Sequence, residues 1–155
     1  MSAALRSLVE RLRERDSGPD RVGLFVDGPN VLRDEFDVDL DDVREEGRSI
    51  GDLALTRLYV DEHATPGLIQ AAEARGFEVV VTSGDVDVKL AVDAVERACS
   101  GTFDALVVVS RDTDFKPVVE TAARYGLETI ALAPGELGRS DALANAVTEA
   151  RVLDD

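Results

Sequence analysis

Five short apolar runs alternate with amphipathic stretches along this chain, and that alternation constrains the fold more than any other feature. The runs are rich in β-branched residues and cover residues 22–26, 53–60, 77–81, 105–109 and 129–132. A helical candidate follows each run, near residues 40–48, 66–76, 86–99, 115–125 and 140–148. Apolar strands that alternate with helices are typical of a parallel sheet covered on both faces. The sequence therefore predicts an α/β fold with three layers.

The length of the chain suits one such domain. It has 155 residues, of which 45% are hydrophobic and 32% charged. A domain of this size buries about 68–70% of the surface that its unfolded chain exposes, which is enough for a stable core. The single cysteine, Cys99, has no partner for an internal disulfide, and the sequence has no Cys/His cluster with zinc spacing. These counts exclude a disulfide scaffold and a structural zinc domain.

The charge balance is strongly acidic. Seventeen Lys and Arg residues stand against 32 Asp and Glu residues, so the net charge is −15, and all the cations except Lys89 and Lys116 are arginines. An acidic, lysine-poor surface indicates a halophilic protein, because at about 1 M salt the Debye length is only about 3 Å and self-repulsion is screened. The alternative is an acidic protein with a basic partner. A nucleic-acid binder that works through a large basic patch is excluded.

The first residues carry a helical apolar stripe, formed by Leu5, Leu8, Val9 and Leu12. We expect residues 1–17 to form an amphipathic helix, whose stripe suits either a homodimer interface or packing on the domain. Charged residues interrupt the stripe too often for the apolar core of a signal peptide. No stretch reaches the roughly 18 apolar residues needed to span a membrane. We therefore expect a cytoplasmic protein with no membrane partner.

Carboxylates follow several of the predicted strands. The first apolar run leads into FVDGPN, which carries Asp27, and the fourth leads into SRDTDF, which carries Asp112 and Asp114. The helix predicted after the third run carries Asp87 and, further along, Asp93. In open α/β sheets, ligands bind outside the carboxyl ends of the strands. Three separate segments are therefore predicted to bring carboxylates to one edge of the sheet.

Clustered carboxylates repel one another, and burying them unpaired costs several kcal/mol each. A divalent cation removes that cost, and oxygen ligands suit Mg²⁺ or Mn²⁺ rather than zinc. Such an ion lowers the pKa of a bound water and stabilises the leaving oxygen of a phosphodiester. The group therefore indicates metal-dependent phosphoester hydrolysis.

Each of these residues also has a purely structural interpretation. Asp112 could be the N-cap of the helix that begins near Asp114, where an acid gains from the helix dipole. Asp93 could form an ion pair with Lys89 or Arg97 at a spacing of four residues. The segment from Asp27 to Asn30 could be a polar turn. The sequence alone leaves these interpretations open beside the metal site.

The motifs FVDGPN, LAVDA and SRDTDF, in this order and spacing, resemble the NYN domain family of PIN-like metal-dependent ribonucleases, which includes LabA-like proteins. The resemblance covers about residues 22–153. Together with the strand–helix alternation, it implies a Rossmann-like (PIN-like) α/β/α domain over residues 21–155, with the N-terminal helix as an extra element. The implied sheet has five parallel strands in the order 3-2-1-4-5, which places the first strand beside the fourth.

The resemblance also implies a set of site residues and a cofactor. Mg²⁺ or Mn²⁺ would be held by four ligands, which are Asp27, Asp93, Asp112 and Asp114. Asn30 and Ser110 would orient the site. Lys89 stands where the family more often has a small residue, and it would contact either a substrate phosphate or Asp93. Beside the resemblance, Arg111 and Lys116 flank the carboxylates in the sequence, which suits either binding of substrate phosphates or salt bridges.

Three functions compete at this point. The leading prediction is a ribonuclease that hydrolyses RNA at a carboxylate-bound metal; the first alternative is a non-catalytic RNA-binding or regulatory PIN-like domain. The second is a Toprim-like nucleic-acid enzyme, since Asp112-Thr113-Asp114 is an acidic pair after a strand, although that class requires Glu where Asp27 stands. A net charge of −15 repels RNA. We therefore expect bound metal and nearby arginines to supply the attraction.

Overall fold

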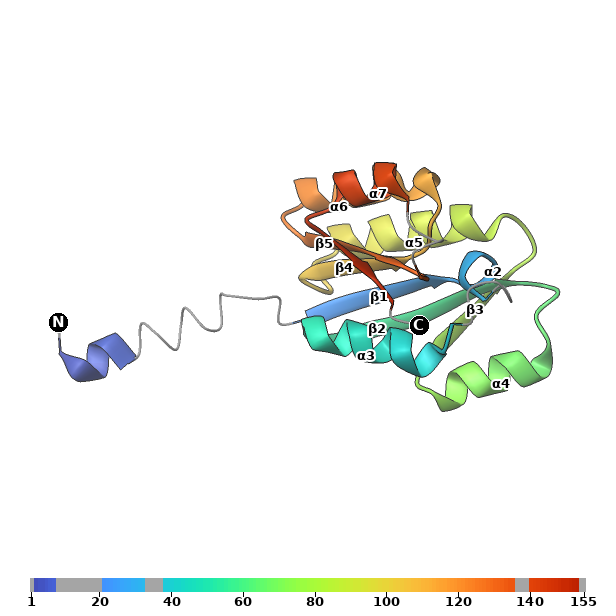
Figure 1. Ribbon diagram of the computed structural model, residues 1–155, viewed down its shortest axis with the longest axis horizontal. Helices are drawn as coiled ribbons and strands as arrows, with labels where there is room; N and C mark the ends of the chain where they lie inside the picture. The colour runs from blue at the N-terminus through green and yellow to red at the C-terminus, as the bar shows by residue number, and fades with distance from the viewer. Residues whose placement is uncertain (1, 8–20, 33–37, 136–139, 154–155) are drawn as a thin grey trace.

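The computed structural model describes residues 2–7, 21–32, 38–135 and 140–153 (Figure 1). Its centre is one parallel sheet in the order β3-β2-β1-β4-β5-β6. The predicted α/β class and the predicted order of the first five strands are confirmed. The strands are β1 (Arg21–Asp27), β2 (Asp52–Asp61), β3 (Glu78–Thr82), β4 (Ala105–Val109), β5 (Glu128–Ala133) and β6 (Glu149–Val152).

The sixth strand corrects the prediction of five. β6 pairs in parallel with β5, with Ala150 opposite Ala131. Its sequence, Glu-Ala-Arg-Val, is short, and its side chains are exposed or half-buried at the edge of the sheet. Because an edge strand of this kind needs no continuous apolar run, the pattern that signals buried strands does not find it.

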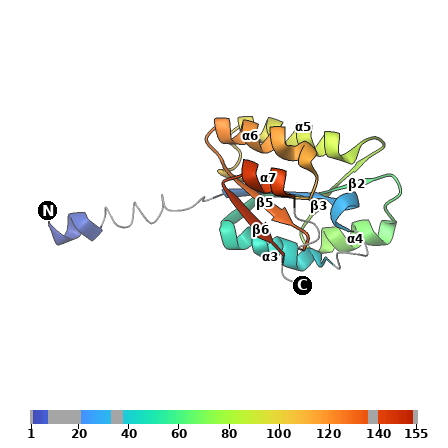
Figure 2. The same cartoon turned by 45° about the horizontal axis from the view of Figure 1, so that its top comes forward.

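Helices cover both faces of the sheet (Figures 1 and 2). α3 and α4 lie on one face, and α5, α6 and α7 lie on the other. Two short elements stand at the carboxyl edge, the one-turn helix α2 and the 3-10 helix η2. The bounds are α2 (Gly28–Val31), α3 (Leu40–Ile50), α4 (Pro66–Ala74), α5 (Val86–Cys99), η2 (Thr113–Phe115), α6 (Lys116–Arg124) and α7 (Asp141–Ala146).

The extra N-terminal helix is present, with residues 3–7 helical. The Ser2 hydroxyl accepts a hydrogen bond from the Leu5 N–H at 3.2 Å, as an N-cap does. The rest of the predicted helix, residues 8–17, lies outside the described residues. Its length and its use as a dimer interface therefore stay predictions.

The core has two halves, one on each face of the sheet. Leu24 and Val26 of β1 pack with α3 and α4 on one side, while Phe25 packs with α5 and α6 on the other. Gly23 leaves room for the Phe103 ring, which would lie 2.6 Å from a Cβ at that position. β1 is therefore covered on both faces, as its continuous apolar sequence predicts.

The strand order reverses between β1 and β4, which are parallel neighbours with Val26 opposite Val109. Polar residues follow both strands at this point, so Asp27 and Ser110 meet at the carboxyl edge of the sheet. A crevice at such a reversal is where open α/β sheets bind their ligands. Among the described residues, no helix is both long enough and apolar enough to cross a membrane.

Candidate metal centre

The innermost carboxylate of the site is Asp27, the last residue of β1. Its side chain is only 4% exposed, and the hydroxyl of Ser110, just after β4, donates a hydrogen bond to its Oδ2 at 3.1 Å. Ser110 is 2% exposed. The pairing of β1 with β4 thus brings together two polar residues that are 83 positions apart in the chain.

The turn after Asp27 is the helix α2, which the sequence suggested only as a break. Gly28 is required there, because a Cβ at this position would clash with the carbonyl oxygen of Tyr59. Asn30 reaches across from α2 and accepts a hydrogen bond from the backbone N–H of Arg111 through its Oδ1, at 3.1 Å. Asn30 therefore ties the segment after β1 to the segment after β4.

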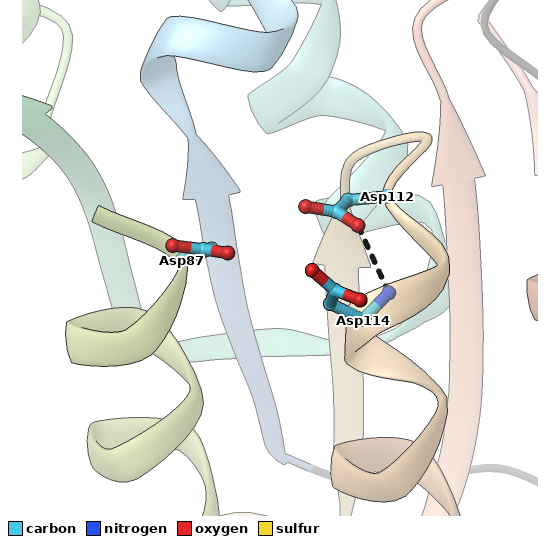
Figure 3. A group of neighbouring side chains, drawn as sticks. All are labelled: Asp87, Asp112 and Asp114. Carbon is cyan, nitrogen blue, oxygen red and sulfur yellow. Dashed lines mark hydrogen bonds between the residues drawn. The ribbon is translucent and has the colours of Figure 1, made fainter. Parts of the chain in front are cut away.

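The segment after β4 is held by its own hydrogen bonds. The Asp112 N–H donates to Ser110 Oγ at 3.1 Å, and Asp112 Oδ1 accepts from the Asp114 N–H at 2.9 Å (Figure 3). Asp112 is thus the N-cap of η2, as its structural interpretation held. The cap does not exclude a second role, because a carboxylate has about four acceptor sites.

Three carboxylates meet at this edge from two segments. One oxygen each of Asp87, Asp112 and Asp114 lies within 4.8 Å of the other two, and Figure 3 shows the side chains directed toward one another. Asp87 belongs to the first turn of α5, which begins at this edge. Two oxygens on opposite sides of a Mg²⁺ ion are about 4.2 Å apart, so the group has the size and the donor atoms of a divalent cation site.

A cleft surrounds this group, which we call the carboxylate cleft. The aspartates that line it are Asp27, Asp61, Asp85, Asp87 and Asp112, and its other lining residues are Pro29, Asn30, Gly84 and Val86. Asp61 ends β2, and Asp85 stands immediately before α5. Among the described residues that line the cleft, none is a lysine or an arginine. The negative charge here is therefore not balanced by the walls of the cleft.

The pKa of Asp27 reports this imbalance. The pKa is raised from 3.8 to about 6, mainly by burial and to a smaller extent by the nearby carboxylates of Asp112 and Asp87. Hydrogen bonds from Ser110 and from the backbone of Asn30 act in the opposite direction. The net shift means that the folded protein holds the Asp27 charge at a cost, which an added cation would relieve.

Asp93, one of the four predicted ligands, does not lie in this group in the structure. Asp93 comes six residues after Asp87, about 9 Å further along α5 at 1.5 Å per residue. Its Oδ2 accepts a hydrogen bond from the Tyr59 hydroxyl at 2.9 Å. Its Oδ1 lies 3.0 Å from Lys89 Nζ, and its Oδ2 lies 3.7 Å from Arg57 Nη1. Of the two interpretations of Asp93, the ion pair is the one that the structure shows.

We call these residues the flank cluster: Arg57, Tyr59, Glu78, Lys89 and Asp93. Arg57 Nε lies 3.1 Å from Glu78 Oε2, so both acids of the cluster have a cation beside them. Burial is the main cause that raises the pKa of Tyr59, which keeps its hydroxyl protonated as the donor to Asp93. Lys89, for which two roles were open, forms the salt bridge.

Sequence reasoning missed two aspartates of the cleft, Asp61 and Asp85, and it placed Asp87 at this edge without including it in the ligand set. A positional rule would have found them. Each lies at the end of a strand or at the first turn of a helix that begins at the carboxyl edge. Asp93, by contrast, is in the middle of its helix and contacts Tyr59 and Lys89.

Comparisons with known proteins agree with this fold. The chain matches the NYN domain over residues 21–154. An uncharacterised protein of Methanocaldococcus jannaschii is 41% identical over 138 residues, which are 89% of this chain and 57% of that protein. The chain therefore spans less than two thirds of the length of this relative.

A solved structure shares the architecture. The crystal structure of a protein of unknown function from Vibrio parahaemolyticus superposes with a TM-score of 0.75. The match covers 88% of this chain and 94% of that protein, at 22% sequence identity. At this identity the likeness shows the fold alone.

Proposed function

The chain belongs to the NYN domain family, and from that premise we propose that it is a ribonuclease that hydrolyses RNA phosphodiesters with Mg²⁺ or Mn²⁺. Membership implies the PIN-like nuclease superfamily. The observation that carries the proposal is the convergence of Asp27, Asp87, Asp112 and Asp114 at one cleft, with no lysine or arginine among the described residues that line it.

The ligands would be Asp87, Asp112 and Asp114, with Asp27 beside them. The structure supports Asp87 rather than Asp93 for this set, because the carboxylate of Asp87 lies in the group. A bound divalent ion supplies Lewis-acid activation of water and of the scissile phosphate. Ser110 and Asn30 hold the carboxylate of Asp27 and the segment of Asp112 in register, so the ligands need little rearrangement.

Negative charge sets the conditions under which such an enzyme meets RNA. At −15, the protein repels a polyanion at low salt. Molar salt limits that repulsion to a range of a few Å. A divalent cation in the cleft offsets part of the negative charge of its aspartates. A halophilic setting therefore fits the proposed activity, and the assay belongs at molar salt.

Two other functions were open from the sequence. Membership of the NYN domain family, and Asp27 in place of a glutamate, both count against a Toprim-like enzyme. A non-catalytic RNA-binding domain with the same fold is the remaining alternative. It would use the same cleft, so only a measurement of cleavage separates the two.

The test is cleavage of single-stranded RNA at molar salt with Mn²⁺ or Mg²⁺ and with chelator. We expect cleavage only with metal, and a loss of at least about a hundredfold in Asp112→Asn and in Asp27→Asn. The double variant should lose little more than either, because both act on one centre. Asp52→Asn is the matched control, since it removes the same charge from an exposed residue at the start of β2, far from the cleft.

The outcomes are separable. Full activity in both variants would contradict the proposal and indicate a contaminating nuclease. If the parent binds Mn²⁺ and RNA but cleaves none of several RNAs, the RNA-binding alternative replaces the ribonuclease.

A further inference from the structure

The two lysines of the chain occupy equivalent positions. The other fifteen of its seventeen cations are arginines, so lysine is nearly absent from this sequence. Asp85 is the N-cap of α5, and Lys89 follows it by four residues; Asp112 is the N-cap of η2, and Lys116 follows it by four residues. Both lysines therefore stand one helical turn away from an aspartate that lines the carboxylate cleft.

This spacing places the backbone of each lysine about one helical turn from the carboxyl edge of the sheet. α5 and α6 both run away from the carboxyl edge of the sheet, so a residue in their first turn is about 6 Å from that edge. The Cα–Cβ bond of a helical residue tilts toward the N-terminus, which here is the end at the cleft. A lysine side chain then spans the remaining distance with its flexible four-carbon stem.

The two lysines differ in their partners. Lys89 Nζ is engaged by Asp93 Oδ1 at 3.0 Å, within the flank cluster. Lys116 is exposed, and within the part of the chain that the structure describes its ammonium has no hydrogen bond and no ion pair. Lys116 thus follows two members of the carboxylate group in the chain, Asp112 by four residues and Asp114 by two, yet it does not pair with them.

We propose that Lys116 binds a phosphate of the RNA backbone next to the phosphate that lies in the carboxylate cleft. This inference rests on the substrate class of the proposed function, but not on cleavage. Lysine suits this position better than arginine, because the planar guanidinium fork pairs bidentately with carboxylates. An arginine here would bind the aspartates of the cleft, whereas a lysine leaves them for a metal ion and still contacts phosphate.

The experiment measures binding of a fluorescently labelled oligouridylate by anisotropy over a range of salt concentrations. Ca²⁺ replaces Mn²⁺ to suppress turnover, and a gel checks that the RNA stays intact. For single strands, each phosphate contact contributes about −0.7 to the slope of log K against log salt. Lys116→Gln should therefore flatten the slope by about 0.7. Relative to the parent, the variant should then lose about three times more affinity at about 0.2 M salt than at about 1 M salt.

Three further variants make the result specific. Arg124→Gln removes the same charge from the other end of α6 and should leave the slope unchanged. Lys89→Gln should change it by less than half as much as Lys116→Gln does, because Lys89 is held by Asp93. Lys116→Arg should restore the slope only in part, because the guanidinium also pairs with the aspartates of the cleft. Thermal unfolding of Lys116→Gln should match that of the parent, which shows that the fold is intact.

The proposal is overturned if Lys116→Gln keeps the slope of the parent, or if Arg124→Gln flattens it equally. It is also overturned if the parent does not bind the oligouridylate. Failure of the ribonuclease proposal looks different: the RNA is bound, the slope depends on Lys116, and no RNA is cleaved with Mn²⁺.

Discussion

The carboxylate cleft and the flank cluster each contain an aspartate of α5, and the two aspartates have opposite electrostatic surroundings. In the flank cluster, Asp93 lies between Lys89 and Arg57 and accepts a hydrogen bond from Tyr59. In the cleft, Asp87 has carboxylates as its neighbours. The difference shows that aspartate content does not define a metal centre. What defines it is a set of acids that the fold holds together in a cleft whose described lining residues include no lysine or arginine.

The comparison also separates two kinds of electrostatic energy. A paired carboxylate stabilises the folded state, or at least costs it little, because its partner compensates for lost hydration. An unpaired and buried carboxylate such as Asp27 destabilises the folded state until a ligand arrives. Removing the charge should therefore have opposite effects in the two regions.

The largest expected difference is in metal binding. Asp87→Asn removes a charged ligand while keeping its shape, so we expect Mn²⁺ affinity to fall at least about a hundredfold, or about 2.7 kcal/mol. Asp93→Asn should leave the affinity within about twofold. Isothermal titration at molar salt measures both. Equal losses in the two variants would mean that the cleft and the cluster are one site.

The next difference is in stability without metal. The pKa of Asp27 is about 6 in the folded protein and 3.8 ordinarily, so the folded state binds the proton more tightly. Its contribution to stability therefore falls as the pH rises from about 4 to about 6. We expect Asp27→Asn to stabilise the chelator-treated protein by about 2 kcal/mol at pH 7.5, against an upper bound of about 3 kcal/mol from the shift.

Urea unfolding at several pH values measures this effect. The stabilisation by Asp27→Asn should shrink as the pH falls toward 4, where Asp27 in the parent is already protonated. A pH-independent gain would show that burial of the charge is not its cause. Added Mn²⁺ should make the parent more stable than Asp27→Asn, because only the parent keeps all the carboxylates of the metal site.

In the flank cluster, the same substitution should have the opposite sign. Asp93→Asn leaves Lys89 and Arg57 without their shared carboxylate, although the new amide oxygen still accepts from Tyr59. We expect a loss of about 1–2 kcal/mol in the free energy of unfolding. The measurement is the same urea titration, at pH 7.5 with chelator. A stabilised Asp93→Asn would abolish the contrast between the two regions.

The smallest expected effect concerns one hydroxyl. Tyr59→Phe removes the donor to Asp93 and keeps the ring, which stacks on Phe25 with 6.2 Å between ring centroids. The loss should be about 1 kcal/mol, the usual size for one hydrogen bond. Affinity for Mn²⁺ should not change. A change in affinity would show that the flank cluster positions the ligands of the cleft through α5.

Much of the fold follows from the sequence because each buried strand is marked by a continuous apolar run. The five apolar runs match β1 to β5, and the reversal between β1 and β4 brings Asp27 to Ser110 and Asp112. β6 could not be predicted in this way, since its stability comes from pairing with β5 rather than from its own composition. Tertiary context decides the structure of such a short polar segment.

The site was predicted best where residues follow strands and less well along the helix α5, where Asp93 rather than Asp87 was included in the ligand set. Asp27, Asp112 and Asp114 had to reach the carboxyl edge because the ends of β1 and β4 are there. For a residue of α5, its position along the helix axis decides whether its side chain lies in the cleft. Asp87 lines the cleft, and Asp93, six residues later, belongs to the flank cluster. The motif that contains Asp93 resembles that of a nuclease family, but a motif does not state which of its acids is paired with cations.

Asp27 and Ser110 stand at the ends of the two innermost strands of the sheet. Opening fluctuations in a folded protein begin at edges and termini, and central strands open last. Local opening at β3 or β6 therefore leaves the floor of the cleft intact. The segment with the least favourable charge belongs to the most cooperative part of the molecule, so a ligand that neutralises this charge should slow global opening more than local fraying.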